Sequence, residues 1–277
     1  MIVQRCFLWN RKMKTILANI SKKEKGVKMQ NSNDVAKNIE IQNKAKLLKV
    51  LYEDNHIIVV EKKPNIPSQS DKTGDIDMLT IVKEYIKEKY NKPGNVYLGL
   101  VHRLDRPVGG IMIFAKTSKA ASRLSNQVRE KIFKKEYIAV VDGKIEDKKG
   151  TLIDYLYKDQ RNNISKVVKK EKKNAKEAKL DYEVIKYNEI KDLSLVKINL
   201  YTGRHHQIRV QLSNFGHSIF GDQKYGKRGK GKQIALWAYK LEIEHPITKK
   251  KIEFKDLPEP IGTWCILKND KNVVEEL

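Results

Sequence analysis

An aspartate flanked by two arginines is the first place in the sequence where side chains could do chemistry. In VHRLDRPVGG, residues 101–110, Asp105 lies between Arg103 and Arg106, and a glycine pair follows. Nearby cations keep a carboxylate ionised even when it is partly buried, as a nucleophile or a general base requires. In an extended segment, Arg103 and Asp105 would share one face. The alternative is a structural ion network beside a tight turn.

A second stretch combines histidines with arginines. YTGRHHQIRVQLSNFG, residues 201–216, predicts a helix that begins at Arg204, on which His205 and Arg209 share a face. Adjacent histidines on a helix point in different directions, and no third ligand follows at a familiar spacing, so we expect no metal. The remaining interpretations are a histidine pair in acid–base catalysis, as in a ribonuclease, and a polar helix with one satisfied histidine.

A third stretch, KKEYIAVVDGK at residues 134–144, alternates as a β-strand and carries Tyr137. A tyrosine in such a strand usually belongs to the core. It becomes a candidate for the site only if the fold brings it to Asp105.

The elements that must position these side chains follow from apolar patterning. Alternating or apolar runs predict strands at 48–52, 56–61, 111–117, 135–143, 179–187, 193–202, 233–246 and 250–255. Apolar stripes and capping residues predict helices at 77–90, 118–131 and 204–216. Strands dominate and show no regular βαβ rhythm, so we expect an α+β fold on a mixed, mainly antiparallel sheet with a few flanking helices.

Composition also divides the chain. Residues 1–45 lack a sustained apolar period and predict a basic, mostly disordered leader. Residues 46–265 predict the folded domain, residues 266–277 a short tail, and the Lys-rich stretch 166–179 a solvated hairpin or loop.

The charge indicates a partner. The 277 residues include 57 Lys and Arg against 34 Asp and Glu, a net charge of +23. Nucleic acid suits such a surface, because Lys and Arg that neutralise phosphates release counterions. The alternative is an AT-rich genome, which favours Lys codons. Yet only 10 of the 57 are Arg, and six of those ten fall at 103–129 and 204–209, where a planar guanidinium would be retained for a purpose.

Other classes are disfavoured. No apolar run approaches the ~20 residues that cross a bilayer, and arginines and lysines interrupt the N-terminal segment where a signal peptide would need an apolar stretch. Cys6 and Cys265 give neither a disulfide framework nor a zinc set. We expect a monomer of the cytoplasm that acts without membrane or metal.

Together these stretches resemble the RluA-type pseudouridine synthases, which isomerise uridine in ribosomal or transfer RNA. The family's HRLD-x4-G pattern corresponds to His102–Gly110, and its K-x-Y-x-A-x-V-x-G strand to Lys135–Gly143. Its TGR-x-HQIR block corresponds to Thr202–Arg209, and the later GD-x2-YG to Gly221–Gly226. The resemblance covers roughly residues 47 to 264.

The sequence departs from the family in three places. Many members carry Thr-Ser before the glycine where this chain has Val108 and Gly109, and Trp237 replaces a histidine. The small RNA-binding domain that often precedes the catalytic domain is not evident in residues 1–45.

The resemblance implies an isomerase that needs no cofactor. Asp105 would be the nucleophile, attacking either the ribose or the base, Arg209 its basic partner, and Tyr137 the residue that stacks on a flipped-out uracil and assists proton transfer. Contacts to RNA or support of the loop are implied for His102, Arg103, Arg106, His206 and Gln207. Two rival functions are an RNA-binding module without catalysis and a metal-free ribonuclease that uses the histidines.

Overall fold

The computed structural model describes residues 33–226, 231, 233–268 and 277. The strands are β1 (Val50–Glu53), β2 (Ile57–Lys62), β3 (Gly99–Leu100), β4 (Gly109–Ala115), β5 (Lys134–Asp142), β6 (Lys149–Asp159), β7 (Ile164–Val168), β8 (Lys176–Asn188), β9 (Leu193–Leu200), β10 (Leu236–Glu244) and β11 (Lys251–Lys255). The helices are one over residues 33–46, then α2 (Met78–Lys89), α3 (Ser118–Arg129), α4 (Gln207–Asn214) and the 3-10 helix η1 (Gly262–Leu267).

The described strands form one 11-stranded sheet in the order β1-β2-β4-β10-β5-β9-β8-β6-β7, with β11 on β10 and β3 on β4. Strand β10 runs parallel to β4, and the other described pairs are antiparallel. The expected α+β fold on a mixed, mainly antiparallel sheet is therefore confirmed.

Helices cover both faces of the sheet around β2 and β4. Every residue of these two strands is buried, and their side chains alternate between the two faces. Ile58 and Met112 pack in the core cluster that contains the apolar face of α2, whereas Ile57 and Ile111 pack with α3. The loop that carries Asp105 leads directly into β4, so its C-terminal end is fixed to a rigid strand.

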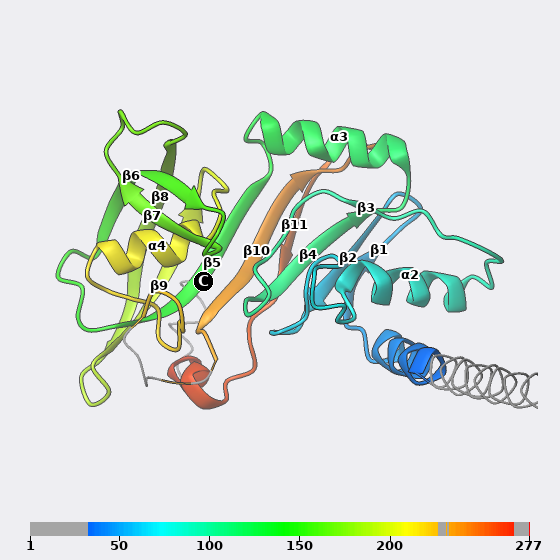
Figure 1. Cartoon of the computed structure of the whole chain (residues 1–277), viewed down its shortest axis with the longest axis horizontal. Helices are drawn as coiled ribbons and strands as arrows, with labels where there is room; N and C mark the ends of the chain where they lie inside the picture. The colour runs from blue at the N-terminus through cyan, green and yellow to red at the C-terminus, as the bar shows by residue number, and fades with distance from the viewer. Residues whose placement is uncertain (1–32, 227–230, 232, 269–276) are drawn as a thin grey trace, which may run out of the picture.

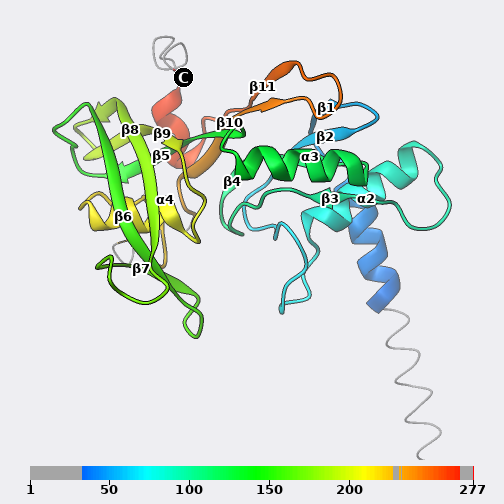
Figure 2. The same ribbon diagram turned by 90° about the horizontal axis from the view of Figure 1, so that it is seen from above.

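The sheet has two differently covered ends (Figures 1 and 2). Helices α2 and α3 lie at the end formed by β1, β2 and β4, while α4 lies against β6–β9 at the other end. Strands β5 and β10 run between them. Tyr137 on β5 pairs with Ile198, which pairs with Tyr182, so the three side chains share one face of the sheet. This face is the one that α4 covers, because the Tyr182 ring contacts Phe215, the C-cap of α4, with ring centroids 5.3 Å apart.

The prediction of a disordered leader is wrong for its last part. Residues 33–46 form a helix, in which Ile41 and Ala45, four residues apart, pack against the core. Two apolar contacts are too few to produce a visible helical period, so this helix was not predicted. Residues 1–32 lie outside the described residues.

The helix predicted at 204–216 begins three residues late. His206 takes a left-handed conformation, with φ 55°, and is the N-cap of α4, which starts at Gln207. His205 and His206 therefore do not point apart as predicted: their rings stack with centroids 3.7 Å apart. Strands β6 and β7 were also missed, because charged and apolar residues are mixed along KGTLIDYLYKD.

Candidate active site

Asp105 lies on a loop whose backbone is fixed on both sides of it. The buried Ser68 hydroxyl donates to the Leu104 carbonyl at 2.7 Å and accepts from the Leu104 N–H at 3.1 Å. On the other side, the buried Lys62 ammonium donates to the Arg106 carbonyl at 2.9 Å. The Asp105 side chain itself makes none of these contacts and is 29% exposed, so the carboxylate is presented to solvent by a rigid turn.

The glycine pair after this loop lets β4 approach β10 closely. A Cβ on Gly110, whose φ is +121°, would lie 2.3 Å from the Ala238 carbonyl oxygen. A Cβ on Gly109 would lie 2.2 Å from the ring of Trp237. The absent side chain of Gly109 therefore leaves the space that the Trp237 ring fills.

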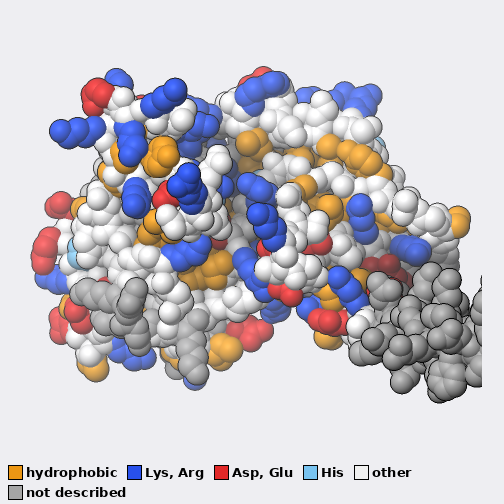
Figure 3. Space-filling model, viewed as in Figure 1, with side chains coloured by type: hydrophobic (Ala, Val, Ile, Leu, Met, Phe, Trp, Pro, Cys, Tyr) orange, Lys and Arg blue, Asp and Glu red, His pale blue; other side chains and the backbone are white. Residues whose placement is uncertain are grey.

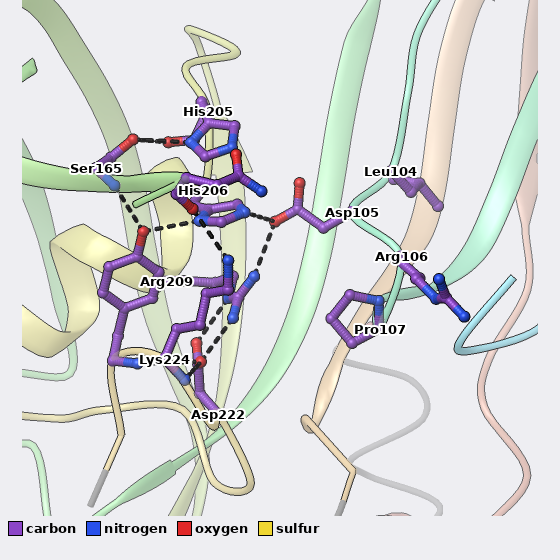
Figure 4. A network of polar contacts seen from close by, with 12 residues as sticks. Leu104, Asp105, Arg106, Pro107, Ser165, His205, His206, Arg209, Asp222 and Lys224 are labelled. Atoms are coloured by element: carbon purple, nitrogen blue, oxygen red, sulfur yellow. Dashed lines mark hydrogen bonds and ion pairs between the residues drawn. The ribbon is translucent and has the colours of Figure 1, made fainter. Parts of the chain in front are cut away.

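Arg209 joins two carboxylates (Figure 4). Its guanidinium donates to both oxygens of Asp222, at 2.7 Å each, and to Oδ2 of Asp105 at 3.3 Å. Burial opposes the charge on Asp222, but the paired guanidinium and two backbone N–H groups hold its pKa below the ordinary value. Arg209 is buried too, and its ion pairs raise its pKa despite that burial. Asp222 thus holds the Arg209 guanidinium in a fixed position beside Asp105.

A chain of hydrogen bonds orients His206 toward Asp105. The Tyr225 hydroxyl accepts from the Ser165 N–H at 2.7 Å and lies 2.7 Å from Nδ1 of His206. With the phenol donating to Nδ1, the imidazole proton lies on Nε2, which faces Asp105 Oδ2 at 3.7 Å. Burial lowers the pKa of His206 to about 3, so the ring is neutral near pH 7.

Tyr137 lies within electrostatic reach of Asp105. It is 7% exposed, and burial together with the Asp105 charge raises its pKa. Its hydroxyl has no hydrogen-bond partner within the described part of the chain. The phenol is therefore protonated, with its hydroxyl free for a substrate.

The other residues predicted from sequence lie at different depths. His102 turns away from the site: its Nε2 accepts the Ile113 N–H at 3.1 Å, and its ring packs on Phe133. Gln207 is buried and accepts from the Arg204 N–H, which closes the turn before α4. Both support the backbone around the site rather than face it.

The two arginines of the Asp105 loop point outward. Arg103 is exposed, and Arg106 pairs with Asp75 at 2.5 Å on the surface. The structure therefore brings Asp105, Tyr137, His206 and Arg209 together and leaves the loop arginines at the rim.

Sequence reasoning missed three residues of the network, which are Ser165, Asp222 and Tyr225. Two of them lie in the GD-x2-YG run, so their spacing was visible although their role was not. Asp222 Oδ1 accepts the N–H of Lys224 and of Tyr225, which winds this run into a turn under Arg209.

The arrangement suits nucleophilic attack by a carboxylate. Asp105 is accessible, a guanidinium contacts it, and a neutral imidazole and a protonated phenol lie around it. Over the residues described, no cluster of three or more His, Cys, Asp and Glu side chains could hold a metal ion. Among those same residues, no helix has the length and apolar character to span a membrane.

The lowered pKa values of three histidines predict that the fold becomes less stable in acid. Burial is the main cause that lowers the pKa from 6.5 to about 3 for His102 and His206, and to about 4 for His205. Below pH 6.5 the unfolded chain binds protons that the folded chain does not, so the free energy of unfolding falls as pH falls.

We expect each of these histidines to contribute a slope of up to about 1.4 kcal/mol per pH unit between about pH 6.5 and 4. His102→Gln keeps an acceptor for the Ile113 N–H and should remove one histidine's share of the slope. Urea unfolding at half-unit pH steps measures it. Equal slopes for the variant and the wild type would contradict neutral burial of His102.

Comparison with known proteins gives consistent matches. A family model described as RNA pseudouridylate synthase matches residues 56–214. An uncharacterized RNA pseudouridine synthase of Bacillus subtilis, YhcT, is 34% identical over 209 residues, which are 74% of this chain and 67% of the relative. The ribosomal large subunit pseudouridine synthase C of Buchnera aphidicola is 34% identical over 218 residues, 76% of this chain and 67% of the relative.

Solved structures agree on the fold. Human RNA pseudouridylate synthase domain containing 4 superposes with a TM-score of 0.68 at 19% identity, over 86% of this chain and 96% of the human one. Human RNA pseudouridylate synthase domain containing 1 gives 0.63 at 23% identity, over 78% and 86%.

Proposed function

Because the chain belongs to the RNA pseudouridylate synthase family and is thus an isomerase, we propose that it converts specific uridines of ribosomal or transfer RNA to pseudouridine. The observation that carries this proposal is the contact of Arg209 with Asp105 at 3.3 Å on an anchored loop, with Tyr137 beside it. A partly exposed carboxylate in contact with a buried guanidinium is held in one orientation, as a nucleophile must be.

In the proposed reaction, Asp105 attacks either the ribose or the base ring. The bond from C1′ to the base nitrogen breaks, the base turns, and a bond forms from C1′ to ring carbon 5. The proton on that carbon leaves, the freed ring nitrogen takes up a proton, and the bond to Asp105 breaks again, which regenerates the carboxylate. The change is redox-neutral and conserves all atoms. The uridine must leave its helical stack to reach Asp105, and we expect Tyr137 to stack on it.

The surface around the site supports an RNA substrate. Figure 3 shows Lys and Arg side chains on both sides of the hollow in the middle of this face. Lys158 and Lys224 lie close enough to lower the pKa of His205, and Arg106 is exposed on the opposite loop. Such cations suit the phosphates on either side of an extruded nucleotide.

The lowered pKa values of His205 and His206 disfavour a ribonuclease built on this histidine pair. Acid–base cleavage uses one protonated and one neutral group near neutral pH. Burial lowers the pKa of both His205 and His206, to about 4 and 3, so neither supplies the acid.

Pseudouridine mapping in cells with and without the gene tests the function and names the substrate. We expect one or a few positions in ribosomal or transfer RNA to lose pseudouridine when the gene is deleted. Release of tritium from uracil carbon 5 by the purified protein, without chain cleavage, distinguishes an isomerase from a binding module and from a nuclease. Identical maps together with no tritium release would contradict the proposal.

Tyr137 gives a prediction about the proton-transfer step. The pKa of its phenol is raised by burial and by the Asp105 charge, and that charge disappears once Asp105 is bound covalently. The phenol then becomes a better proton carrier. We expect Tyr137→Phe to bind the mapped RNA like the wild type but to turn over ~100-fold more slowly or worse.

Tyr137→Leu is the companion variant, since it also removes the ring. It should weaken binding by roughly a further 1–3 kcal/mol, the value of one base–aromatic stack. Binding assays and tritium release on the same RNA separate the two effects. Full turnover of Tyr137→Phe would remove the hydroxyl from the mechanism.

A further inference from the structure

A lysine beside Tyr137 is unused by the chemistry described so far. Lys135 lies two residues before Tyr137 on β5, so both side chains project from the same face, ~7 Å apart along the strand. Its side chain is only partly exposed. Within the described part of the chain, its ammonium has neither a carboxylate nor a hydrogen-bond acceptor in reach.

Two other largely buried lysines, in contrast to Lys135, are paired with carboxylates. Lys116 and Lys240, which are also largely buried, each contact a glutamate, at 2.7 and 3.0 Å. Burial lowers the pKa of Lys135, and no carboxylate offsets it. A partly desolvated ammonium without a partner lowers the stability of the fold, so this charge does not serve the fold itself.

Gly203 leaves open space in front of the same ammonium. A Cβ built on Gly203 would have one neighbour, Lys135 Nζ at 3.5 Å, and its φ lies outside the left-handed region. Neither backbone nor packing therefore requires glycine here, in contrast to Gly110, whose Cβ would collide with the backbone of β10. The missing side chain keeps the approach to Lys135 free.

The position of Lys135 relates it to the reacting loop. Its charge contributes to the low pKa of His102, so the ammonium lies near the segment that leads to Asp105. Gly203 belongs to the turn before α4, which carries Arg209. Lys135 thus lies where β5, the Asp105 loop and the turn before α4 meet, beside Tyr137.

We propose that Lys135 binds a backbone phosphate of the RNA next to the extruded uridine, in the space that Gly203 leaves open. The inference rests on the proposed function and adds a positioning contact to it. A phosphate would supply the negative charge and the hydrogen-bond acceptors that no described residue provides to this ammonium. The contact would hold the strand while the base stacks on Tyr137.

The test compares Lys135→Met with Lys134→Met, a control on the adjacent, exposed position of the same strand. Pseudouridine formation is measured on the RNA identified by mapping, and binding is measured in the Asp105→Asn background. We expect Lys135→Met to raise KM and Kd about 10-fold or more, with a smaller change in kcat. Its slope of log affinity against log salt should fall by about 0.7, the value of one phosphate contact on a single strand.

Stability separates this role from a structural one. Lys135→Met removes an unpaired charge, so its thermal midpoint should equal or exceed that of the wild type. Gly203→Ala should also weaken binding without loss of stability, because its methyl group enters the phosphate space. Lys135→Arg should retain more affinity than Lys135→Met.

RNA with single neutral methylphosphonates locates the contact. At one position beside the uridine, the wild type and Lys135→Met should bind equally. An unchanged KM and salt slope, or a fall in thermal midpoint that accompanies the lost binding, would overturn the inference. If the wild type forms no pseudouridine in any RNA, the proposed function fails instead, which is a distinct result.

Discussion

Replacing Asp105 by asparagine should abolish isomerisation and leave the fold and RNA affinity almost unchanged. The amide has the shape of the carboxylate but cannot act as the nucleophile. The loop around it is held by Ser68 and Lys62 through backbone groups, not by the carboxylate. Arg209 keeps both bonds to Asp222. We expect turnover to fall by about 10⁴-fold or more.

Tritium release from uracil carbon 5 measures the loss, and filter binding and thermal unfolding measure what remains. Asp147→Asn is the matched control, since it makes the same substitution at an exposed carboxylate on the turn between β5 and β6. Wild-type turnover in Asp105→Asn would exclude Asp105 as the nucleophile. A large fall in thermal midpoint would instead show that the carboxylate supports the fold.

Local patterns predicted the elements whose burial is regular. The strands at 56–61 and 111–117 correspond to β2 and β4, and the helices at 77–90 and 118–131 to α2 and α3. Each of these elements buries a continuous run or one clear stripe. Their neighbours in space, not in sequence, decide the order of strands in the sheet, and no local pattern contains that information.

Elements with mixed composition were missed for a physical reason. β6 buries Leu156 but leaves Ile153 59% exposed, so the apolar signal of its two faces cancels. The start of α4 depends on the left-handed backbone of His206, a conformation that few non-glycine residues adopt. A helical period cannot reveal it.

In the site, too, features that depend on contacts between distant parts of the chain could not be predicted from local patterns. Asp105 and Arg209 are separated by 104 residues, and their proximity was expected only from the family resemblance. Asp222, which accepts two bonds from Arg209, received no role, because an ion pair that is fully buried leaves no periodic trace. The roles of Asp105, Tyr137 and Arg209 remain proposals that the variants decide.

Arg209→Met should lose most activity near neutral pH and also destabilise the fold. Without the guanidinium, Asp105 loses the contact at 3.3 Å that orients its carboxylate. Asp222, whose side chain is 1% exposed, is left buried without its partner. Such a loss costs roughly 3–5 kcal/mol. Arg209→Lys keeps the charge but not the planar fork, and should retain more activity.

A double variant separates the two consequences of losing Arg209. Asp222→Asn keeps an acceptor for the N–H groups of Lys224 and Tyr225 but carries no charge. Combined with Arg209→Met, it removes the buried unpaired carboxylate, so stability should recover by about 2 kcal/mol or more relative to Arg209→Met alone. Activity at neutral pH should not recover, because Asp105 still lacks its cation. Urea unfolding and pH–rate profiles on the mapped RNA measure the two. If activity returns together with stability, Arg209 acts only through the fold, and the stabilisation of Asp105 must come from elsewhere in the site.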